Sequence, residues 1–166
     1  MSELGIPSDY AAKRRLAPQV EATELVSVAS GSDGRAIRLA PDAASAWKRM
    51  RDAASSEGIA LLAISGFRSI ERQTEIIQRK LLAGEKIEAI LSTVAAPGYS
   101  EHHTGRAIDI GIPDEPPLTE GFALTPAFRW LKGHAGGFGF KLSYPKGNPQ
   151  GFVYEPWHWC FHAQID

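Results

Sequence analysis

The sequence has a single cysteine, Cys160, no long apolar run and almost no net charge. One cysteine excludes an intrachain disulfide, so cysteine pairing says nothing about the redox compartment. A membrane span needs roughly 18 or more consecutive apolar residues, and no segment approaches that length, so we expect no membrane insertion. A formal net charge of -1 gives no electrostatic reason to expect nucleic acid or an anionic membrane as a partner.

A secretory signal is also absent from the start of the chain. Residues 1–19 include basic side chains, but the apolar stretch that a signal peptide requires does not follow them. Since the chain begins with its own methionine, we expect the protein to stay in the cytoplasm. If a targeting segment has been removed, the periplasm or the cell envelope is the alternative.

The composition that is present belongs to an ordinary globular protein. Of the 166 residues, 43% are hydrophobic and 22% are charged, which suits one domain over residues 1–166 with a buried core. Helix-like and strand-like patterns are mixed along the chain. They predict an α+β domain with a small, mainly antiparallel sheet and flanking helices.

The first structural unit that we expect, over residues 23–57, is a hairpin followed by a helix. Asp33-Gly34 suits the hairpin turn, because apolar and polar residues alternate on both sides of it. The helix would be capped by Asp42 and ended by Gly58. Its expected buried face consists of Ala43, Trp47, Met50 and Ala54.

The rest of the chain alternates between strand-like and helix-like segments. The almost wholly apolar run at 59–65 suggests a central strand. The further helices that we expect lie at 70–83, 86–95 and 125–134, and the further strands at 106–112, 139–144 and 151–161.

The segment "YSEHHTGRAIDIG", residues 99–111, places two histidines and an aspartate around a glycine. Gly105 permits a tight bend, so His102 before it and Asp109 after it could converge. An imidazole nitrogen and a carboxylate oxygen are suitable zinc ligands. A buried Asp109 would also need a metal or an arginine beside it to offset the cost of its charge. The adjacent His103 could be the ligand instead of His102.

The segment "EPWHW" offers a third ligand and a base. Glu155 and His158 would point to opposite faces of a regular strand, but Pro156 favours a bulge or a strand start. A local bend there could bring both side chains into one pocket. With His158 as third ligand, a fourth zinc position would stay open for water, whose proton Glu155 could accept. From the residues alone, ordinary buried histidines and carboxylates remain an open alternative.

Three ordered motifs resemble the signatures of the zinc D-Ala-D-Ala carboxypeptidase family. They are "SGFRSIERQ", "SEHHTGRAID" and "EPWHW", and the segment "LTPAFRWLKGHAGGFGFKLSYP" is also similar to that family's pattern. The resemblance spans roughly residues 59–162. It implies the fold shared by lysostaphin-type peptidases and the signalling domain of hedgehog proteins.

The resemblance also implies roles for particular residues. The ligands of one zinc ion would be His102, Asp109 and His158. Glu155 would be the base that activates water, and Arg68 would stabilise the negative oxygen of the tetrahedral intermediate. Contacts with the substrate would come from Gln73, Ser100, Tyr144 and Trp157. His103 stands where close relatives usually have glutamine.

Members of this family cleave peptides of the bacterial cell wall, so the expected partners are peptidoglycan stem peptides or muropeptides. An L,D-carboxypeptidase that removes the terminal D-Ala of tetrapeptides is favoured, since a cytoplasmic D,D-carboxypeptidase would damage pentapeptide precursors made there. A D,D-carboxypeptidase and an endolysin-type endopeptidase remain alternatives. A binding module without catalysis is disfavoured, because a structural metal site has no use for a base at Glu155.

Overall fold

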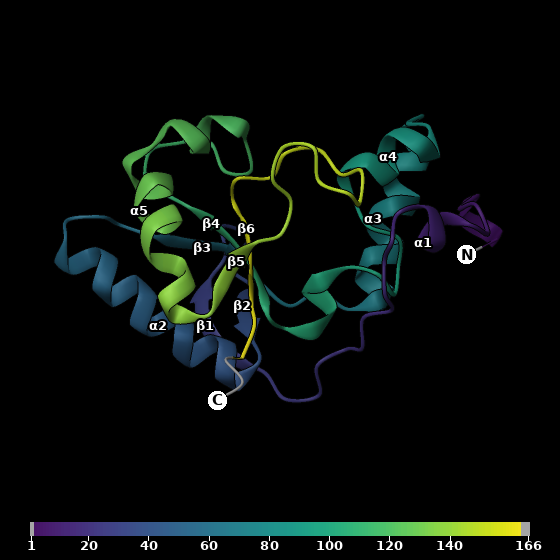
Figure 1. The fold of residues 1–166 in the computed structure, drawn as a ribbon. Coiled ribbons are helices and arrows are strands. Elements are labelled where there is room, and N and C mark those ends of the chain that lie inside the picture. Colours follow the sequence, from purple (N-terminus) through teal and green to yellow (C-terminus); the bar gives the residue numbers. More distant parts are fainter. Residues whose placement is uncertain (1, 164–166) are drawn as a thin grey trace.

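The computed structural model describes residues 2–163, which form two antiparallel sheets surrounded by helices (Figure 1). One sheet is a two-stranded hairpin and the other has four strands in the order β3-β4-β6-β5. The strands are β1 (Val26–Ser30), β2 (Ala36–Leu39), β3 (Leu62–Ser65), β4 (Ala107–Gly111), β5 (Phe140–Leu142) and β6 (His158–Phe161). The predicted α+β class with a small antiparallel sheet is confirmed.

The helices form two groups on opposite sides of the four-stranded sheet in the view of Figure 1, with α2 and α5 in one group and α1, α3 and α4 in the other. Their bounds are α1 (Tyr10–Lys13), α2 (Pro41–Ser56), α3 (Ile70–Leu82), α4 (Ile87–Thr93) and α5 (Pro126–His134). Short 3-10 helices are η1 (Ser2–Leu4), η2 (Glu101–Thr104), η3 (Glu120–Leu124) and η4 (Ala135–Phe138). In the part of the chain that the structure describes, none of these helices has the length and apolarity of a membrane span.

The hairpin and the helix after it follow the sequence pattern, with one correction. Gly34 has φ +76° in the turn between β1 and β2, a left-handed conformation that glycine adopts without strain. Helix α2 begins at Pro41 after Ala40, so Asp42 is not its cap. Proline fits the first helical position because its φ is already helical and its missing N–H is not needed there. The four side chains predicted to be buried on α2 are at most 2% exposed.

The position of β3 differs from the prediction. The apolar run at 59–65 was expected to form a central strand, but β3 lies at the edge of the sheet and Leu62 is 41% exposed. The central strands are β4 and β6, and all five residues of β4 are buried. Side chains of β3 line a cleft together with Val28 of the hairpin and Trp47 of α2. A central strand would have a strand on each side. Beside β3, the hairpin and α2 lie where a second neighbouring strand was expected.

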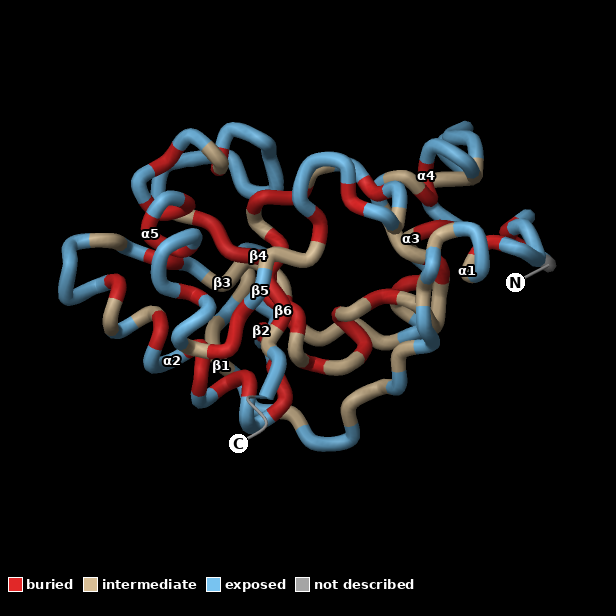
Figure 2. The backbone as a smooth tube through the Cα atoms, viewed as in Figure 1, coloured by how far each residue is buried: buried red, intermediate tan, exposed pale blue. Residues whose placement is uncertain are grey.

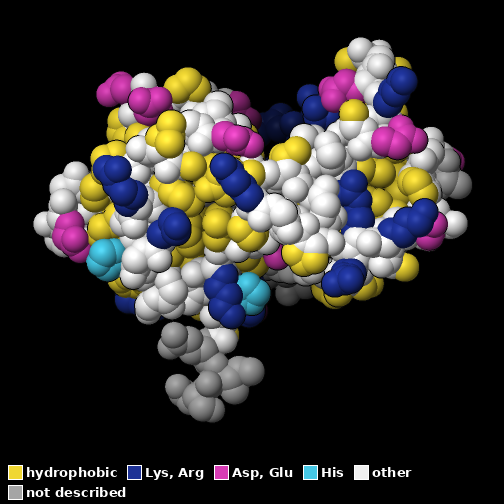
Figure 3. All heavy atoms as spheres, turned by 45° about the horizontal axis from the view of Figure 1, so that its top comes forward, with side chains coloured by type: hydrophobic (Ala, Val, Ile, Leu, Met, Phe, Trp, Pro, Cys, Tyr) yellow, Lys and Arg dark blue, Asp and Glu magenta, His cyan; other side chains and the backbone are white. Residues whose placement is uncertain are grey.

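Two separate hydrophobic clusters stabilise the two sides of the molecule. The larger joins α2 and α5 to the central strands through Trp47, Ile108 and Leu131, which are almost fully buried. The smaller joins the N-terminal segment to α3 and α4, with Ile77 and Ile90 fully buried. Figure 2 shows buried backbone along both sets of elements. On the face in Figure 3, hydrophobic side chains gather over the half of the molecule that holds α2 and α5.

Candidate metal and active site

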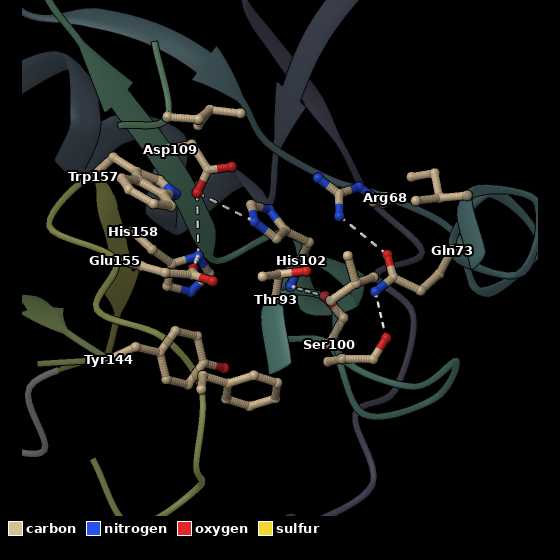
Figure 4. Close-up of a pocket in the computed structure, with 15 residues that line it drawn as sticks. Arg68, Gln73, Thr93, Ser100, His102, Asp109, Tyr144, Glu155, Trp157 and His158 are labelled. Carbon is tan, nitrogen blue, oxygen red and sulfur yellow. Dashed lines mark hydrogen bonds and ion pairs between the residues drawn. The ribbon is translucent and has the colours of Figure 1, made fainter. Parts of the chain in front are cut away.

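His102, Asp109 and His158 converge in one pocket, and all three are buried (Figure 4). Asp109 and His158 are directly opposite each other in the register of β4 and β6. His102 comes from η2, which ends at Gly105 with φ +66°. A Cβ on Gly105 would lie 2.9 Å from the backbone nitrogen of Ala40, so glycine permits both the bend and the close approach to α2.

The three candidate ligand atoms have the spacing that one metal ion needs. Asp109 Oδ1 lies 3.4 Å from His102 Nε2 and 3.1 Å from His158 Nδ1, and the three atoms are all within 4.8 Å of one another. Tetrahedral coordination with bonds of about 2.0–2.2 Å places ligand atoms about 3.3–3.6 Å apart. The two distances from Asp109 are close to these values and the third distance is at most 4.8 Å, so the three residues could hold one metal ion such as zinc.

Both histidine rings are held through the nitrogen that does not face Asp109. His102 Nδ1 lies 2.7 Å from the carbonyl oxygen of Gly66, so this nitrogen is the donor and Nε2 keeps its lone pair. His158 Nε2 lies 2.8 Å from Glu101 Oε2. Hydrogen bonds of this kind fix the tautomer and ring orientation of metal-ligating histidines.

The buried charges of the site depend on one another. Burial alone would raise the pKa of Asp109, but the two neighbouring imidazoles hold it well below its usual range. Burial lowers the pKa of His102. For His158 burial also acts to lower the pKa, yet the hydrogen bonds with Asp109 and Glu101 outweigh it and raise the pKa to about 10. The carboxylates thus favour positive charge at the point where the ligand atoms meet.

Glu155 lies in the same pocket because the chain turns just before β6. The backbone N–H of His158 donates to the carbonyl of Glu155 at 3.2 Å, and Pro156 within this turn is fully buried. The predicted local bend is therefore present, and Glu155 Oε2 lies 3.8 Å from His158 Nδ1. Burial raises the pKa of Glu155 to about 7, although the positive charges of His158 and Arg68 oppose the increase. A carboxylate with this pKa is suited to exchanging protons near neutral pH.

Arg68 follows β3 and reaches the pocket from the start of α3, where Ser69 caps the helix by accepting from the Arg72 N–H. Its Nη1 donates to Gln73 Oε1 at 3.1 Å, and its Nη2 donates to Ser65 Oγ at 3.4 Å. Figure 4 shows the guanidinium directed toward the candidate ligands. Burial lowers the pKa of Arg68, and the charges of Asp109 and Glu155 counteract this.

The other predicted substrate contacts line the same cavity, whose volume is about 240 Å³. Gln73 is 1% exposed and donates through Nε2 to the carbonyl of Ala95 at 2.6 Å, so its amide also orients Arg68. Ser100 accepts from the backbone N–H of His102 at 3.3 Å. The ring of Tyr144 packs on the ring of His158 with 4.8 Å between centroids. Trp157 completes this wall of the cavity.

His103 does not face the candidate ligand atoms. Its Nδ1 lies 2.6 Å from the carbonyl oxygen of Arg68, and its Nε2 accepts from the backbone N–H of Gly98 at 3.1 Å. Both ring nitrogens are therefore used to hold loop backbone. Of the two adjacent histidines, only His102 belongs to the group that could hold a metal ion.

Several residues of the site were not identified from the sequence. Additional lining comes from Ile76, Thr93, Leu118 and Phe152. Glu101, which contacts His158, is part of a quoted motif, and its only sequence signal is a carboxylate next to a candidate ligand. Ser143, which donates to Glu101 Oε2 at 2.6 Å, carries no such signal. Gly66 is required because a Cβ there would lie 2.4 Å from the carbonyl oxygen of Arg38.

The family model of VanY, D-alanyl-D-alanine carboxypeptidase, matches residues 36–164. The chain belongs to this family, which confirms the resemblance inferred from the three motifs. Among curated relatives, YodJ of Bacillus subtilis (strain 168) is 37% identical over 160 residues, covering 94% of this chain. The chain spans 56% of the length of that relative.

Solved structures of similar proteins support the same assignment. The LdcB LD-carboxypeptidase is 34% identical with a TM-score of 0.70, and the match covers 93% of this chain and 68% of LdcB. A mutant of the D,D-pentapeptidase VanY from a VanB-type resistance cassette, in complex with Zn(II), is 30% identical with a TM-score of 0.66. That match covers 94% of this chain and 82% of the VanY chain.

Proposed function

We propose that the protein is a zinc-dependent carboxypeptidase that releases a C-terminal D-Ala from peptidoglycan stem peptides. The observation that carries the proposal is the convergence of His102, Asp109 and His158 in one pocket with Glu155 and Arg68. Family membership supports the peptidase activity, and Zn(II) in the VanY neighbour supports the choice of metal.

The zinc ion would be held by His102 Nε2, Asp109 Oδ1 and His158 Nδ1. When bound, such an ion supplies Lewis acidity, which polarises a carbonyl and lowers the pKa of water. Two imidazoles and one carboxylate are a usual ligand set for a catalytic zinc, because three protein ligands leave room for the reacting groups.

Glu155 is the proposed base. Its carboxylate takes a proton from water as the water oxygen attacks the carbonyl carbon of the last peptide bond. After attack, the C–N bond breaks and the same proton passes to the leaving amine of the terminal residue.

Arg68 is the proposed stabiliser of the oxyanion. As the carbonyl carbon becomes tetrahedral, negative charge develops on its oxygen, and a preorganised guanidinium lowers the energy of that state. The hydrogen bonds to Gln73 and Ser65 preorganise the side chain before the substrate arrives. The low effective dielectric constant of a buried site strengthens this electrostatic interaction.

The lining of the cavity supports binding of a peptide end. The cavity, with a volume of about 240 Å³, holds both polar groups and apolar walls. Ser100 and Gln73 offer polar groups to the substrate backbone or its terminal carboxylate. Tyr144 and Trp157 offer apolar walls for the side chain of a small residue.

An L,D-carboxypeptidase acting on tetrapeptide stems is the favoured specificity, and a D,D-carboxypeptidase acting on D-Ala-D-Ala ends is the second candidate. Similarity to the LdcB LD-carboxypeptidase supports the first. Similarity to the VanY D,D-pentapeptidase supports the second.

The deciding experiment incubates purified protein, loaded with zinc, with tri-, tetra- and pentapeptide stems and identifies the products by mass spectrometry. An L,D-carboxypeptidase converts tetrapeptide to tripeptide plus D-Ala and leaves pentapeptide intact. A D,D-carboxypeptidase converts pentapeptide to tetrapeptide. Absence of D-Ala release from every peptide, with zinc bound, would overturn the proposed activity.

A further inference from the structure

We propose that Glu101 and Ser143 position His158 as a metal ligand, a role that rests on the proposed zinc site. The two residues form a chain of hydrogen bonds behind the ring of His158. Neither is among the residues that line the cavity. They are positioning residues, because they reach the site through His158 and do not touch the cavity themselves.

The ring of His158 is held between two carboxylates. Its Nδ1 lies 3.1 Å from Asp109 Oδ1, and its Nε2 lies 2.8 Å from Glu101 Oε2. The two ring nitrogens point in different directions, so a carboxylate that accepts from Nε2–H directs Nδ1 toward Asp109 and His102. It also keeps the proton on Nε2, which leaves the lone pair of Nδ1 for a metal ion.

Ser143 holds the carboxylate of Glu101 in turn. Its hydroxyl donates to the same Oε2 atom at 2.6 Å. Glu101 belongs to η2, and Ser143 follows directly after β5, so the hydrogen bonds connect η2, the end of β5 and the start of β6. The side chain of Glu101 is 23% exposed, whereas that of His158 is only 4% exposed. The chain of hydrogen bonds therefore runs from the buried His158 toward the surface.

Glu101 is placed to orient a ligand and not to serve as one. Its carboxylate contacts Nε2, whereas the candidate ligand atom of His158 is Nδ1. The group of side chains that could hold one ion contains His102, Asp109 and His158 but not Glu101. The base role also falls elsewhere, because Glu155 lines the cavity and Glu101 does not.

The two histidine ligands differ in how they are held, and this makes the inference testable. His102 is oriented by a backbone carbonyl, that of Gly66, and not by a side chain. His158 is oriented by a side chain, so substitution of Glu101 should free its ring. Loss of such a partner typically weakens metal affinity about 10- to 100-fold.

The test measures the dissociation constant for zinc by competition with a chromophoric chelator. We expect Glu101→Ala to raise Kd about 10- to 100-fold. Glu101→Gln keeps an oxygen acceptor without the negative charge, so its Kd should fall between those of wild type and Glu101→Ala. Ser143→Ala should raise Kd less than Glu101→Ala. The matched control is Glu85→Gln, an exposed carboxylate paired with Lys80 on the surface, which should leave Kd unchanged.

The melting temperature of each metal-free variant separates positioning from general stability. A positioning role predicts a metal-free melting temperature near that of wild type and a smaller increase on adding zinc. Wild-type Kd in Glu101→Ala, or equal Kd values for the Ala and Gln variants, would overturn the inference. If Glu101→Ala does not fold, the Kd values of Glu101→Gln and Ser143→Ala for zinc test the inference. Wild-type Kd values in both of these variants would overturn it. Absence of zinc binding in the wild type would instead refute the proposed function.

Discussion

Asp109 and His158 face each other across the pair of central strands, with Asp109 Oδ1 3.1 Å from His158 Nδ1. Two of the three candidate ligands are thus set by the register of β4 and β6, which the surrounding sheet makes rigid. The third, His102, arrives from a 3-10 helix whose position depends on Gly105. The strand register and the bend at Gly105 thus place the three candidate ligands together, and this leads to the following predictions.

Removal of the metal should abolish activity reversibly. The protein should contain one zinc ion per chain when purified without chelator, since one group of three ligands is present among the described residues. Dialysis against a strong chelator should stop release of D-Ala, and addition of one equivalent of zinc should restore it. Metal analysis checks the stoichiometry. Full activity in protein shown to be free of metal would contradict the prediction.

Glu155→Gln should remove the base and keep the metal. Glutamine has nearly the same shape but cannot accept the proton, and loss of a general base typically costs about 10²- to 10⁴-fold in rate. Steady-state kinetics and zinc content are measured on the same preparation. Glu120→Gln, an exposed carboxylate outside the pocket, is the control. Near wild-type turnover in Glu155→Gln would assign the base elsewhere.

Arg68→Lys should lower kcat with a smaller change in KM. A guanidinium presents donors in a fixed fork, and lysine cannot reproduce the bonds to Gln73 and Ser65 together with one to the oxyanion. Loss of an oxyanion donor generally costs about 10²- to 10³-fold in kcat. Arg72→Lys, on α3 and paired with Glu75 at the surface, should keep wild-type kcat. Equal kcat in Arg68→Lys and wild type would refute the role.

Gly66→Ala should destabilise the protein and weaken zinc binding together. A Cβ at this position would lie 2.4 Å from the carbonyl oxygen of Arg38, so the backbone must shift, and the Gly66 carbonyl that orients His102 shifts with it. Overpacking of this kind costs about 1–3 kcal/mol. Gly133→Ala on α5 is the control, because nothing lies within 4 Å of its added Cβ. Unchanged melting temperature and zinc affinity in Gly66→Ala would contradict the prediction.

His103→Gln should keep zinc, whereas His102→Gln should lose it. Both nitrogens of His103 bond to loop backbone, at Arg68 and Gly98, so its substitution affects the loop and not the ligands. We expect a lower melting temperature in His103→Gln with one zinc ion still bound. Metal analysis of the two variants checks this. Zinc loss in His103→Gln alone would identify His103 as the ligand.

Local sequence patterns predicted most of the secondary structure. Helix α3 was predicted at 70–83 and lies at Ile70–Leu82, since its apolar period and its stop at Gly84 act within a few residues. The three motifs also identified the side chains that meet in the pocket. Short-range rules suffice where neighbouring residues decide the conformation, as in the turn that brings Glu155 and His158 together.

Only the tertiary structure decided which neighbours each segment meets. An apolar strand pattern predicts that side chains are buried, but it does not predict which elements cover them. The edge position of β3 beside the hairpin was therefore missed. Two adjacent histidines cannot be distinguished from the sequence alone. In the folded chain, His103 forms hydrogen bonds with loop backbone, whereas His102 lies among the candidate metal ligands. The contact from Glu101 to His158 joins residues 57 positions apart, and a contact at that separation depends on how η2 packs against the sheet.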